Sequence, residues 1–239
     1  MTYQDKLKEF ANFVKGGIIA SCQASLGEPL NSPIHINALA QSCLLGGARA
    51  IRLEGVDNIN FVRKNTKAYI VGLTKDDISE ENKYRQVYIT RTKNDAKALS
   101  VAGADIIAID ATNRYRSFDC DLASLINYIH HDLNLPVWAD TSTVDEGINA
   151  HKLGCDIIST TLYGYTEETK EIAKGPGFKL LSGLSKNIPN TILILEGKVD
   201  CPKDVRKGFK CGAHAIVVGS AITRPILITR KFVEAAVVK

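Results

Sequence analysis

The sequence predicts an α/β protein in which eight parallel strands alternate with helices and close into a (β/α)8 TIM barrel. Three observations predict this fold. Eight short apolar runs occur in turn, and a helical pattern follows most of them, which is typical of a parallel sheet covered by helices. A glycine-led motif ends the stretch before four of these runs. The length of 239 residues is close to that of a single barrel, about 250 residues.

The predicted elements follow one another in a regular order. Leu7, Phe10, Phe13 and Val14 share one helical face, so residues 1–15 are predicted to form a short helix before the barrel. The predicted strands are residues 17–22, 48–53, 69–73, 106–110, 136–140, 157–161, 191–196 and 215–219. The clearest helical patterns are residues 38–45, 95–102, 122–132, 144–153 and 202–210. No linker composition divides the chain, so we expect residues 1–239 to form one barrel domain.

Four glycines mark the places where a strand is about to begin. In each place an amphipathic stretch ends at a glycine, a small residue follows, and an apolar run starts, at Gly47, Gly103, Gly154 and Gly212. Glycine just past a helix end is the left-handed cap that lets the chain turn sharply. The copies lie about 50 to 60 residues apart, the length of two βα units. Eight repeats favour a closed barrel over an open doubly wound sheet, whose G-x-G-x-x-G signal is absent.

Composition argues against several classes of protein. The net charge of +4 is modest and no basic run occurs, so nucleic-acid binding has little support. No apolar run approaches the ~18 residues that a membrane span needs. The six cysteines form no C-x-x-C pair and no metal-ligand spacing, which indicates reduced thiols in a reducing compartment. We expect a cytoplasmic protein with neither nucleic acid nor membrane as a partner.

Polar and ionisable residues lie at the carboxyl ends of the predicted strands. A polar residue at one strand end is explained equally well by the chain emerging into water. Eight such ends together, with two cations and three carboxylates, favour an active site, because barrel enzymes keep their chemistry at this face. In chain order the ends are Cys22-Gln23, Arg52, Lys75, Asp110, Asp140, Thr160-Thr161, Glu196-Gly197 and Gly219-Ser220.

The charged strand ends suggest specific chemistry. A lysine beside a glutamate in a narrow mouth has a perturbed pKa, which suits Lys75 and Glu196 to proton transfer near neutral pH. Arg52 on a neighbouring strand could clamp an anion or a carbonyl oxygen. No histidine is predicted at a strand end, which disfavours a histidine-based metal site. Trp138 lies inside a predicted strand and is interpreted as packing.

Small residues at the last two strand ends favour a phosphate site over simple tight turns. Gly197, Gly219 and Ser220 would let backbone N–H groups approach a phosphate, and a helix is predicted to start near Thr223. Phosphate sites of barrels often lie at this place. A charged stretch, residues 75–84, follows the third strand, and the short run 87–90 comes after it. This stretch is either a lid or site wall, or a solvated insertion.

The ordered motifs resemble those of the N-acetylmannosamine-6-phosphate 2-epimerase family. The resemblance runs from about Gly17 to Phe232. Single motifs such as GADIIA recur in many phosphate-binding barrels, whereas the ordered set is specific. The set comprises ASCQASLGEPL from Ala20, GARAIRLEG from Gly47, GADIIAIDAT from Gly103, ADTSTVDEG from Ala139, TTLYGYTEET from Thr160, LEGK from Leu195 and VVGSAITRP from Val217.

The resemblance implies a fold, an activity and a set of site residues. It implies a (β/α)8 barrel that converts N-acetylmannosamine 6-phosphate into N-acetylglucosamine 6-phosphate in sialic-acid breakdown, without a metal or organic cofactor. Family members are commonly homodimers. The catalytic residues carried over are Lys75 and Glu196. The substrate contacts carried over are Gln23, Arg52, Asp140 and Arg224, and the phosphate contacts are Gly197, Gly219 and Ser220.

The chain departs from the family pattern in three places. Asp76 stands where a cation usually follows the catalytic lysine, and we expect it to favour the charged form of Lys75. Lys198 replaces the usual arginine, which keeps the charge but loses bidentate geometry. Asp140-Thr141-Ser142-Thr143 also differs by one residue from the usual Asp-Ile-Ser-Thr. These changes bear on rate or substrate preference rather than on the fold.

The expected mechanism removes and returns a proton at C2 of the open-chain sugar, where the C1 aldehyde acidifies the C–H bond. Lys75 would act as base or acid at C2, Arg52 would stabilise enolate charge or position the sugar, and Glu196 would orient hydroxyl groups or assist ring opening. Two alternatives remain at this stage. One is another isomerase or lyase on a phosphate-binding barrel, and the other is a weakly active sugar-phosphate-binding protein.

Overall fold

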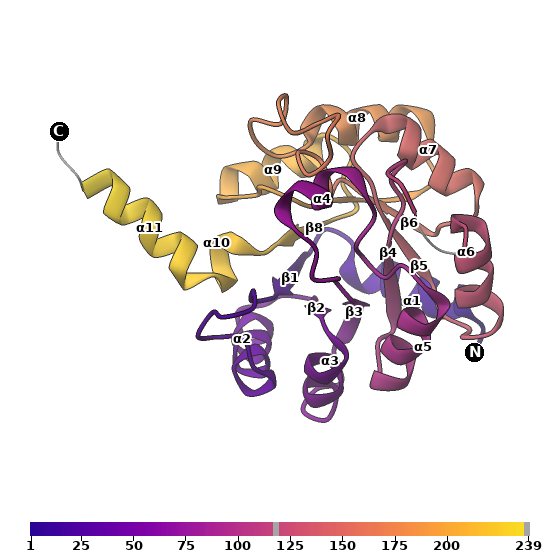
Figure 1. Cartoon of the computed structure of the whole chain (residues 1–239), viewed down its shortest axis with the longest axis horizontal. Coiled ribbons are helices and arrows are strands. Elements are labelled where there is room, and N and C mark those ends of the chain that lie inside the picture. The colour runs from indigo at the N-terminus through magenta and orange to yellow at the C-terminus, as the bar shows by residue number, and fades with distance from the viewer. Residues whose placement is uncertain (117–119, 237–239) are drawn as a thin grey trace.

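The computed structural model describes residues 1–116 and 120–236 and shows a closed barrel of eight parallel strands (Figure 1). Each strand pairs with the next in chain order, and β8 pairs with β1. The predicted barrel is therefore confirmed. The strands are β1 (Ile18–Cys22), β2 (Ala50–Glu54), β3 (Tyr69–Leu73), β4 (Ile106–Asp110), β5 (Val137–Asp140), β6 (Ile157–Ser159), β7 (Ile192–Leu195) and β8 (Ala215–Val218).

Helices surround the barrel and follow its strands. Those after the first seven strands are α2 (Pro33–Leu45), α3 (Val56–Arg63), α5 (Lys93–Ala102), α6 (Leu122–His131), α7 (Val144–Lys152), α8 (Phe178–Asn187) and α9 (Pro202–Lys210). The short helix α4 (Glu80–Arg85) lies in the charged stretch after β3. Helix α2 begins five residues before the predicted position, because Ser32 caps it and Pro33 fits its first turn.

The four glycines of the repeated motif adopt the predicted left-handed conformation. Their φ angles are 95° at Gly47, 102° at Gly103, 101° at Gly154 and 101° at Gly212. Residues with a Cβ rarely adopt these angles. At Gly103 a Cβ would also lie 2.6 Å from Cγ of Arg63. The motif therefore turns the chain from the outer layer of helices back into the barrel.

The amino-terminal end of the barrel is closed by α1 (Tyr3–Val14). Phe10 and Val14 are buried in one cluster with inward-facing strand residues such as Ile19 and Ala50. The helix is also tied by its backbone, since Nε2 of His214 lies 2.8 Å from the carbonyl oxygen of Ala11. The sequence left open whether residues 1–15 cover the barrel bottom, and the structure shows that they do.

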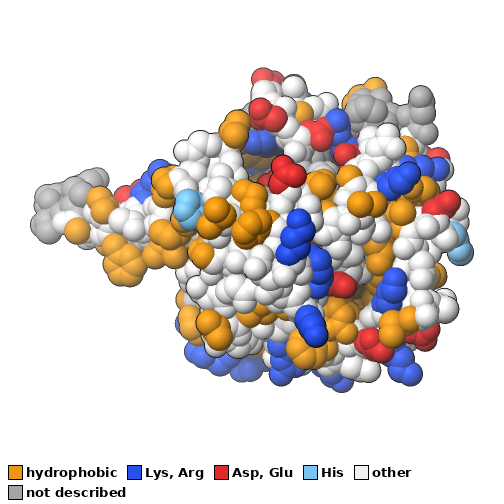
Figure 2. Space-filling model, turned by 90° about the horizontal axis from the view of Figure 1, so that it is seen from below, with side chains coloured by type: hydrophobic (Ala, Val, Ile, Leu, Met, Phe, Trp, Pro, Cys, Tyr) orange, Lys and Arg blue, Asp and Glu red, His pale blue; other side chains and the backbone are white. Residues whose placement is uncertain are grey.

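The carboxyl-terminal helix is the exception to the layered arrangement. After α10 (Ser220–Thr223), the helix α11 (Pro225–Ala236) has no buried residue and projects from the barrel (Figure 1). Its exposed apolar side chains include Phe232 and Val233, and Figure 2 shows hydrophobic side chains along this projecting arm. Within the described residues, no helix is both long and apolar enough to cross a membrane.

Candidate active site

The barrel interior changes from apolar to polar along its strands. Every second side chain of a strand points inward, so Ala50 near the bottom of β2 is followed inward by Arg52, and Trp138 of β5 by Asp140. The apolar layer packs against α1, whereas the polar layer opens into a cavity of about 560 Å³ at the carboxyl ends of the strands. This is the face on which barrel enzymes carry their active sites.

Arg52 lies at the centre of the polar layer and joins three strands. Its Nη1 and Nη2 donate to Oδ1 and Oδ2 of Asp140 at 3.0 and 2.5 Å, and Nη1 also donates to Oε2 of Glu196 at 2.9 Å. The side chains of Arg52 and Asp140 are 1% and 0% exposed. Burial by itself lowers the pKa of Arg52, but the charges of Asp140 and Glu196 outweigh it and raise that pKa. Arg52 therefore stays charged.

Arg52 also has hydrogen-bond donors to spare. A guanidinium carries five N–H groups, and three bonds to the two carboxylates use three of them. The buried Nε has no partner among the described residues, and Arg52 lines the cavity. Leaving a buried donor unpaired is costly, so an oxygen of a bound molecule would stabilise this arrangement.

Trp138 does more than the packing predicted from the sequence. Its ring is fully buried and lies under Arg52, with the guanidinium carbon 5.3 Å from the ring centroid. Its indole N–H donates to Oδ1 of Asp140 at 3.1 Å and to Oγ of Ser159 at 3.0 Å. The interpretation as packing alone was incomplete, because the sequence does not show that a polar layer begins at the level of this ring.

Glu196 follows β7 and is held at both its backbone and its side chain. Thr160 bonds its backbone on both sides, with Oγ1 accepting from N of Glu196 at 3.0 Å and donating to its carbonyl oxygen at 2.8 Å. In addition to Arg52, Oγ1 of Thr161 donates to Oε2 at 3.0 Å. Burial raises the pKa of Glu196 to about 7, although Arg52 opposes this shift. The carboxyl group can therefore change protonation near neutral pH.

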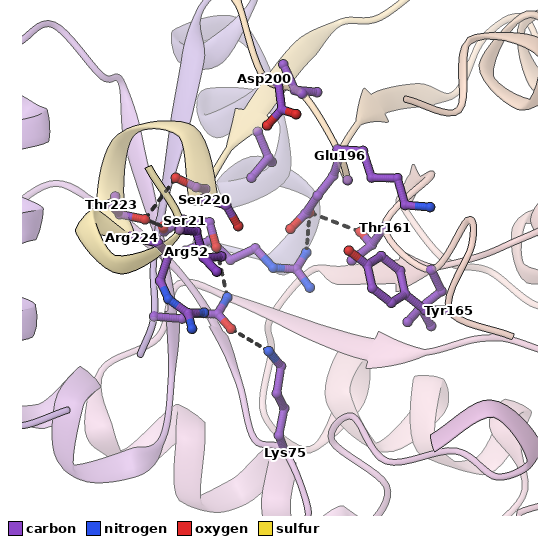
Figure 3. A pocket seen from close by; sticks show the side chains of 18 of the residues that line it. Ser21, Arg52, Lys75, Thr161, Tyr165, Glu196, Asp200, Ser220, Thr223 and Arg224 are labelled. Carbon is purple, nitrogen blue, oxygen red and sulfur yellow. Dashed lines mark hydrogen bonds and ion pairs between the residues drawn. The ribbon is translucent and has the colours of Figure 1, made fainter. Parts of the chain in front are cut away.

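Lys75 comes from the segment after β3 and reaches Gln23, which follows β1. Its Nζ donates to Oε1 of Gln23 at 2.7 Å (Figure 3). Solvent reaches the side chain through the open mouth, yet protein walls surround it, and this partial desolvation lowers the pKa of Lys75. The charge of Glu54 opposes the shift and that of Arg52 adds to it. A lysine with a lowered pKa supplies more neutral amine at pH 7.

Contrary to the prediction from the sequence, Asp76 is not the residue that favours the charged form of Lys75. Its carboxylate pairs with Arg91, and the carboxylates that raise the pKa of Lys75 are those of Glu54, Glu196 and Asp140. The net shift of Lys75 is downward because burial dominates. Neighbours in an extended chain point to opposite sides, which is why a residue adjacent in sequence is not the electrostatic partner.

The predicted phosphate residues lie together at one end of the cavity. Gly197, Gly219 and Ser220 all line it. Gly197 has a φ of 96°, and a Cβ there would lie 3.2 Å from the carbonyl oxygen of Thr161, so glycine is required at this turn. The helix expected near Thr223 starts earlier, since α10 begins at Ser220 and Gly219 is its N-cap.

The predicted substrate contacts are distributed unevenly around the cavity. Gln23, Arg52 and Arg224 line it, whereas Asp140 lies behind Arg52. Arg224 is paired with Glu28. Lys198 lines the cavity too, but its Nζ donates to the carbonyl oxygen of Ala173 at 2.7 Å. Asp140 thus reaches a bound molecule only through Arg52.

Sequence reasoning assigned no role to several side chains that line the cavity, among them Ser21, Tyr88 and Tyr165, and it placed Thr161 only at a strand end. The inward alternation of a strand could have found two of them, because Ser21 stands two residues before Gln23 and Thr161 two residues after Ser159. Tyr88 belongs to the run 87–90, which folds back so that Ile89 bridges Lys75. The charged stretch is thus divided: of the side chains that the structure describes in residues 75–84, Lys75 lines the cavity, and Tyr88 and Ile89 form the adjacent wall.

Together, the fold and the cavity place the chain among (β/α)8 barrels with an ionisable, anion-compatible site at the carboxyl ends of the strands. A family model described as putative N-acetylmannosamine-6-phosphate epimerase matches residues 36–238. The chain belongs to this family, as its motifs suggested.

Individual relatives agree with this assignment. A putative N-acetylmannosamine-6-phosphate 2-epimerase of Clostridioides difficile is 45% identical over 93% of this chain and 96% of its own length. The solved structure of the N-acetylmannosamine-6-phosphate 2-epimerase from Clostridium perfringens superposes with a TM-score of 0.87 at 38% identity, covering 94% of this chain and 95% of that one. A thiamine phosphate pyrophosphorylase from Pyrococcus furiosus, at 17% identity and a TM-score of 0.60, shares the fold alone.

Proposed function

We propose that this protein epimerises N-acetylmannosamine 6-phosphate to N-acetylglucosamine 6-phosphate, a step of sialic-acid breakdown. The observation that carries the proposal is the pair of shifted groups, Lys75 and Glu196, in one cavity with Arg52. The pKa of Glu196 is raised to about 7 and that of Lys75 is lowered by desolvation, and both shifts favour the proton removal and return that C2 epimerisation requires. The family assignment supplies the substrate.

The mechanism begins with the open-chain sugar. The neutral amine of Lys75 takes the C2 proton, and the electrons of the C–H bond move toward the C1 carbonyl to give an enolate. Arg52 lies within the cavity with unused N–H groups and stabilises the oxygen on which charge develops. Glu196 orients the substrate hydroxyl groups and assists ring opening. A donor that exchanges protons with solvent then protonates C2 from the opposite face to give the epimer, and Lys75 returns its proton to solvent.

The remaining site residues bind and orient the sugar phosphate. Gln23 positions Lys75 through the bond from its Nζ, and Asp140 holds Arg52 in place. At the other end, Gly197, Gly219 and Ser220 take the phosphate, and Arg224 adds a positive charge nearby. The phosphate then anchors one end of the substrate so that C2 lies near Lys75.

The test is turnover of N-acetylmannosamine 6-phosphate in D2O, followed by NMR of the product. We expect epimerisation with deuterium incorporated at C2. We expect Lys75→Ala to lower kcat at least about 1000-fold, because the group that takes the proton is gone. The matched control is Lys97→Ala on the exposed side of α5, which should retain wild-type kcat.

Three results would contradict the proposal. Rapid epimerisation without deuterium at C2 would argue against an exchangeable base. Full activity of Lys75→Ala would remove Lys75 from the mechanism. If the wild-type protein bound the sugar phosphate without converting it, it would be a binding protein rather than an enzyme.

We further propose that the enzyme is a homodimer. The other long helices after strands pack on the barrel, whereas α11 contacts little beyond α10 and leaves its apolar residues exposed. A helix of this kind is not stable in water without a partner surface. A second copy of the chain offers that surface, because its own barrel has the same uncovered position after β8.

We also propose that the protein works in the cytoplasm. All six cysteines are free thiols, and Cys22, Cys120 and Cys155 are buried. Free thiols persist in a reducing compartment. Fractionation of cells that produce the protein at native level would test this, with recovery outside the cytoplasm as the contrary result.

A further inference from the structure

Glu196 presents only one of its two carboxylate oxygens to the cavity. Oε2 accepts from Nη1 of Arg52 at 2.9 Å and from Oγ1 of Thr161 at 3.0 Å. Among the described residues, no hydrogen bond to Oε1 is found, and Glu196 lines the cavity. The carboxyl group is therefore anchored through one oxygen and open through the other (Figure 3).

The hydroxyl of Thr161 belongs to a chain of hydrogen bonds that starts at the barrel core. Nε1 of Trp138 lies 3.0 Å from Oγ of Ser159, and Oγ of Ser159 lies 2.6 Å from Oγ1 of Thr161. The chain thus links three strand ends, those of β5, β6 and β7, and its last member is Glu196. Trp138 and Ser159 are fully buried, so bulk water does not compete for these bonds.

The hydrogens of these groups limit how the bonds can run when Glu196 is ionised. An ionised carboxylate only accepts and each hydroxyl has a single hydrogen, so the Thr161 hydroxyl gives its hydrogen to Oε2 of Glu196 and can accept from Ser159. The single hydrogen of Ser159 has two other acceptors, because its Oγ also lies 3.0 Å from Oδ1 of Asp140 and 3.1 Å from the carbonyl oxygen of Ala139. The bond from Thr161 to Glu196 forms whichever of these acceptors Ser159 uses.

We propose that Thr161 is a positioning residue for Glu196: its hydroxyl, which lies beside Ser159, holds Oε2 so that Oε1 faces the substrate. Arg52 alone does not do this, because it holds the carboxyl group through a single bond from Nη1, whose other N–H goes to Asp140. A second donor from another strand removes the freedom of the carboxyl group to rotate about that single bond. This inference rests on the proposed role of Glu196 in catalysis.

The same bond affects how readily Glu196 gains a proton. Four other groups act on its charge: Arg52 and Asp140 from β2 and β5, Lys75 from the segment after β3, and Tyr165 from the loop after β6. Burial raises the pKa of Glu196 to about 7, and the bond from Thr161 opposes that rise. A threonine that made no hydrogen bond to Glu196 would not lower the pKa of Glu196 in this way.

The experiment compares Thr161→Val, which removes the hydroxyl at nearly constant shape, with Thr161→Ser, which retains it. The carboxyl carbon of Glu196 is followed by ¹³C NMR from pH 5 to 9 without substrate, and Glu196→Gln identifies the resonance. We expect Thr161→Val to raise the midpoint by about one pH unit and to lower kcat about 10- to 100-fold with KM within about threefold. Thr161→Ser should keep both values near wild type.

Two further variants make the result decisive. Ser159→Ala removes the hydroxyl that Thr161 contacts together with the bonds of Ser159 to Asp140 and Trp138, so its midpoint is compared with that of Thr161→Val and is not interpreted alone. Thr191→Val makes the same substitution next to the opposite end of β7 and should change neither value. If Thr161→Val does not fold, Thr161→Ala carries the test. An unchanged midpoint in the folded variant, or equal losses in Thr161→Val and Thr161→Ser, would overturn the proposal.

The NMR readout also separates this inference from the proposed function. If the wild-type protein does not convert N-acetylmannosamine 6-phosphate, the proposed function fails while the titration of Glu196 still reports on Thr161. If turnover is found and the midpoint does not move, the inference about Thr161 fails alone.

Discussion

Among the single residues of the site, Glu196 is a carboxyl group in a buried position, where ionisation is energetically unfavourable. Glu196 shares a buried arginine with Asp140, and its pKa is raised to about 7 from an ordinary 4.5, mainly by burial. A group whose pKa is raised on folding binds protons more tightly in the folded state. Its contribution to stability is present below pH 4.5 and is lost as the pH rises to 7. The protein therefore gives up stability at neutral pH to keep a reactive carboxyl group.

We predict that Glu196→Gln is more stable than wild type at pH 8. The expected gain is at most about 3 kcal/mol, because each pKa unit corresponds to about 1.4 kcal/mol. The difference should shrink to about 1 kcal/mol at pH 5 and vanish below about pH 4, where the glutamate is protonated in both the folded and the unfolded state. Thermal unfolding at one protein concentration measures it, with about 2–4 °C in Tm for each kcal/mol. The exposed Glu168→Gln is the control and should show no pH-dependent difference; equal Tm values of Glu196→Gln and wild type at pH 8 would contradict the argument.

At the scale of elements, the loop from β5 into α7 shows how a carboxylate can hold two segments together. Glu146 is 2% exposed, and Oε2 accepts from N and Oγ of Ser142 at 2.7 and 2.8 Å and from N of Thr143 at 3.1 Å. Oε1 accepts from N of Asn113, in the segment after β4, at 2.8 Å. Glu146 thus completes a capping box with Thr143 and holds the loops after β4 and β5 together.

We predict that Glu146→Ala lowers the free energy of unfolding by about 3 kcal/mol or more, because four donors lose a buried acceptor. The matched control is Asp95→Ala, which breaks the capping box of α5 at a less buried position. It should cost only about 1 kcal/mol. Urea unfolding measures both. Equal losses would show that Glu146 acts as a helix cap and nothing more.

Local patterns predicted most elements well, and the exceptions have physical causes. The carboxyl ends of the strands were located correctly to within about two residues because inward polar residues follow apolar ones there. The run 87–90 was found, but its return to Lys75 was not, because an isolated bridge leaves no periodic signal. The start of α2 was missed because Ser32-Pro33 is a capping signal rather than a hydrophobic one.

At the scale of the whole molecule, the barrel is closed at its bottom by α1 and open at its top, and α11 stands away from it (Figure 1). The base of α11 contributes to the site, since Leu227 and Arg230 line the cavity and Lys231 pairs with Asp200 at 2.8 Å. Assembly through α11 would therefore act on the mouth of the site as well as on stability.

We predict that the wild-type protein sediments as a dimer at micromolar concentration and that the double variant Phe232→Asp, Val233→Asp sediments as a monomer. The physical reason is that these two apolar side chains, 74% and 57% exposed, would be buried against the second copy. Thr229→Asp adds one charge to the same exposed helix and is the control for charge alone. A monomeric wild-type protein would contradict the homodimer.

The order of strands and helices, the glycine turns and the residues at the ends of the strands can be predicted from the sequence. They depend on patterns a few residues long, which hydrophobic periodicity and capping chemistry set locally. Three features became visible only in the folded barrel: Arg52 joins Asp140 and Glu196, 88 and 144 positions away, Asp76 pairs with Arg91, and Trp138 lies beside the polar residues that lead to Thr161. These contacts form only when the barrel closes, because closure brings distant strand ends together and shields their side chains from water.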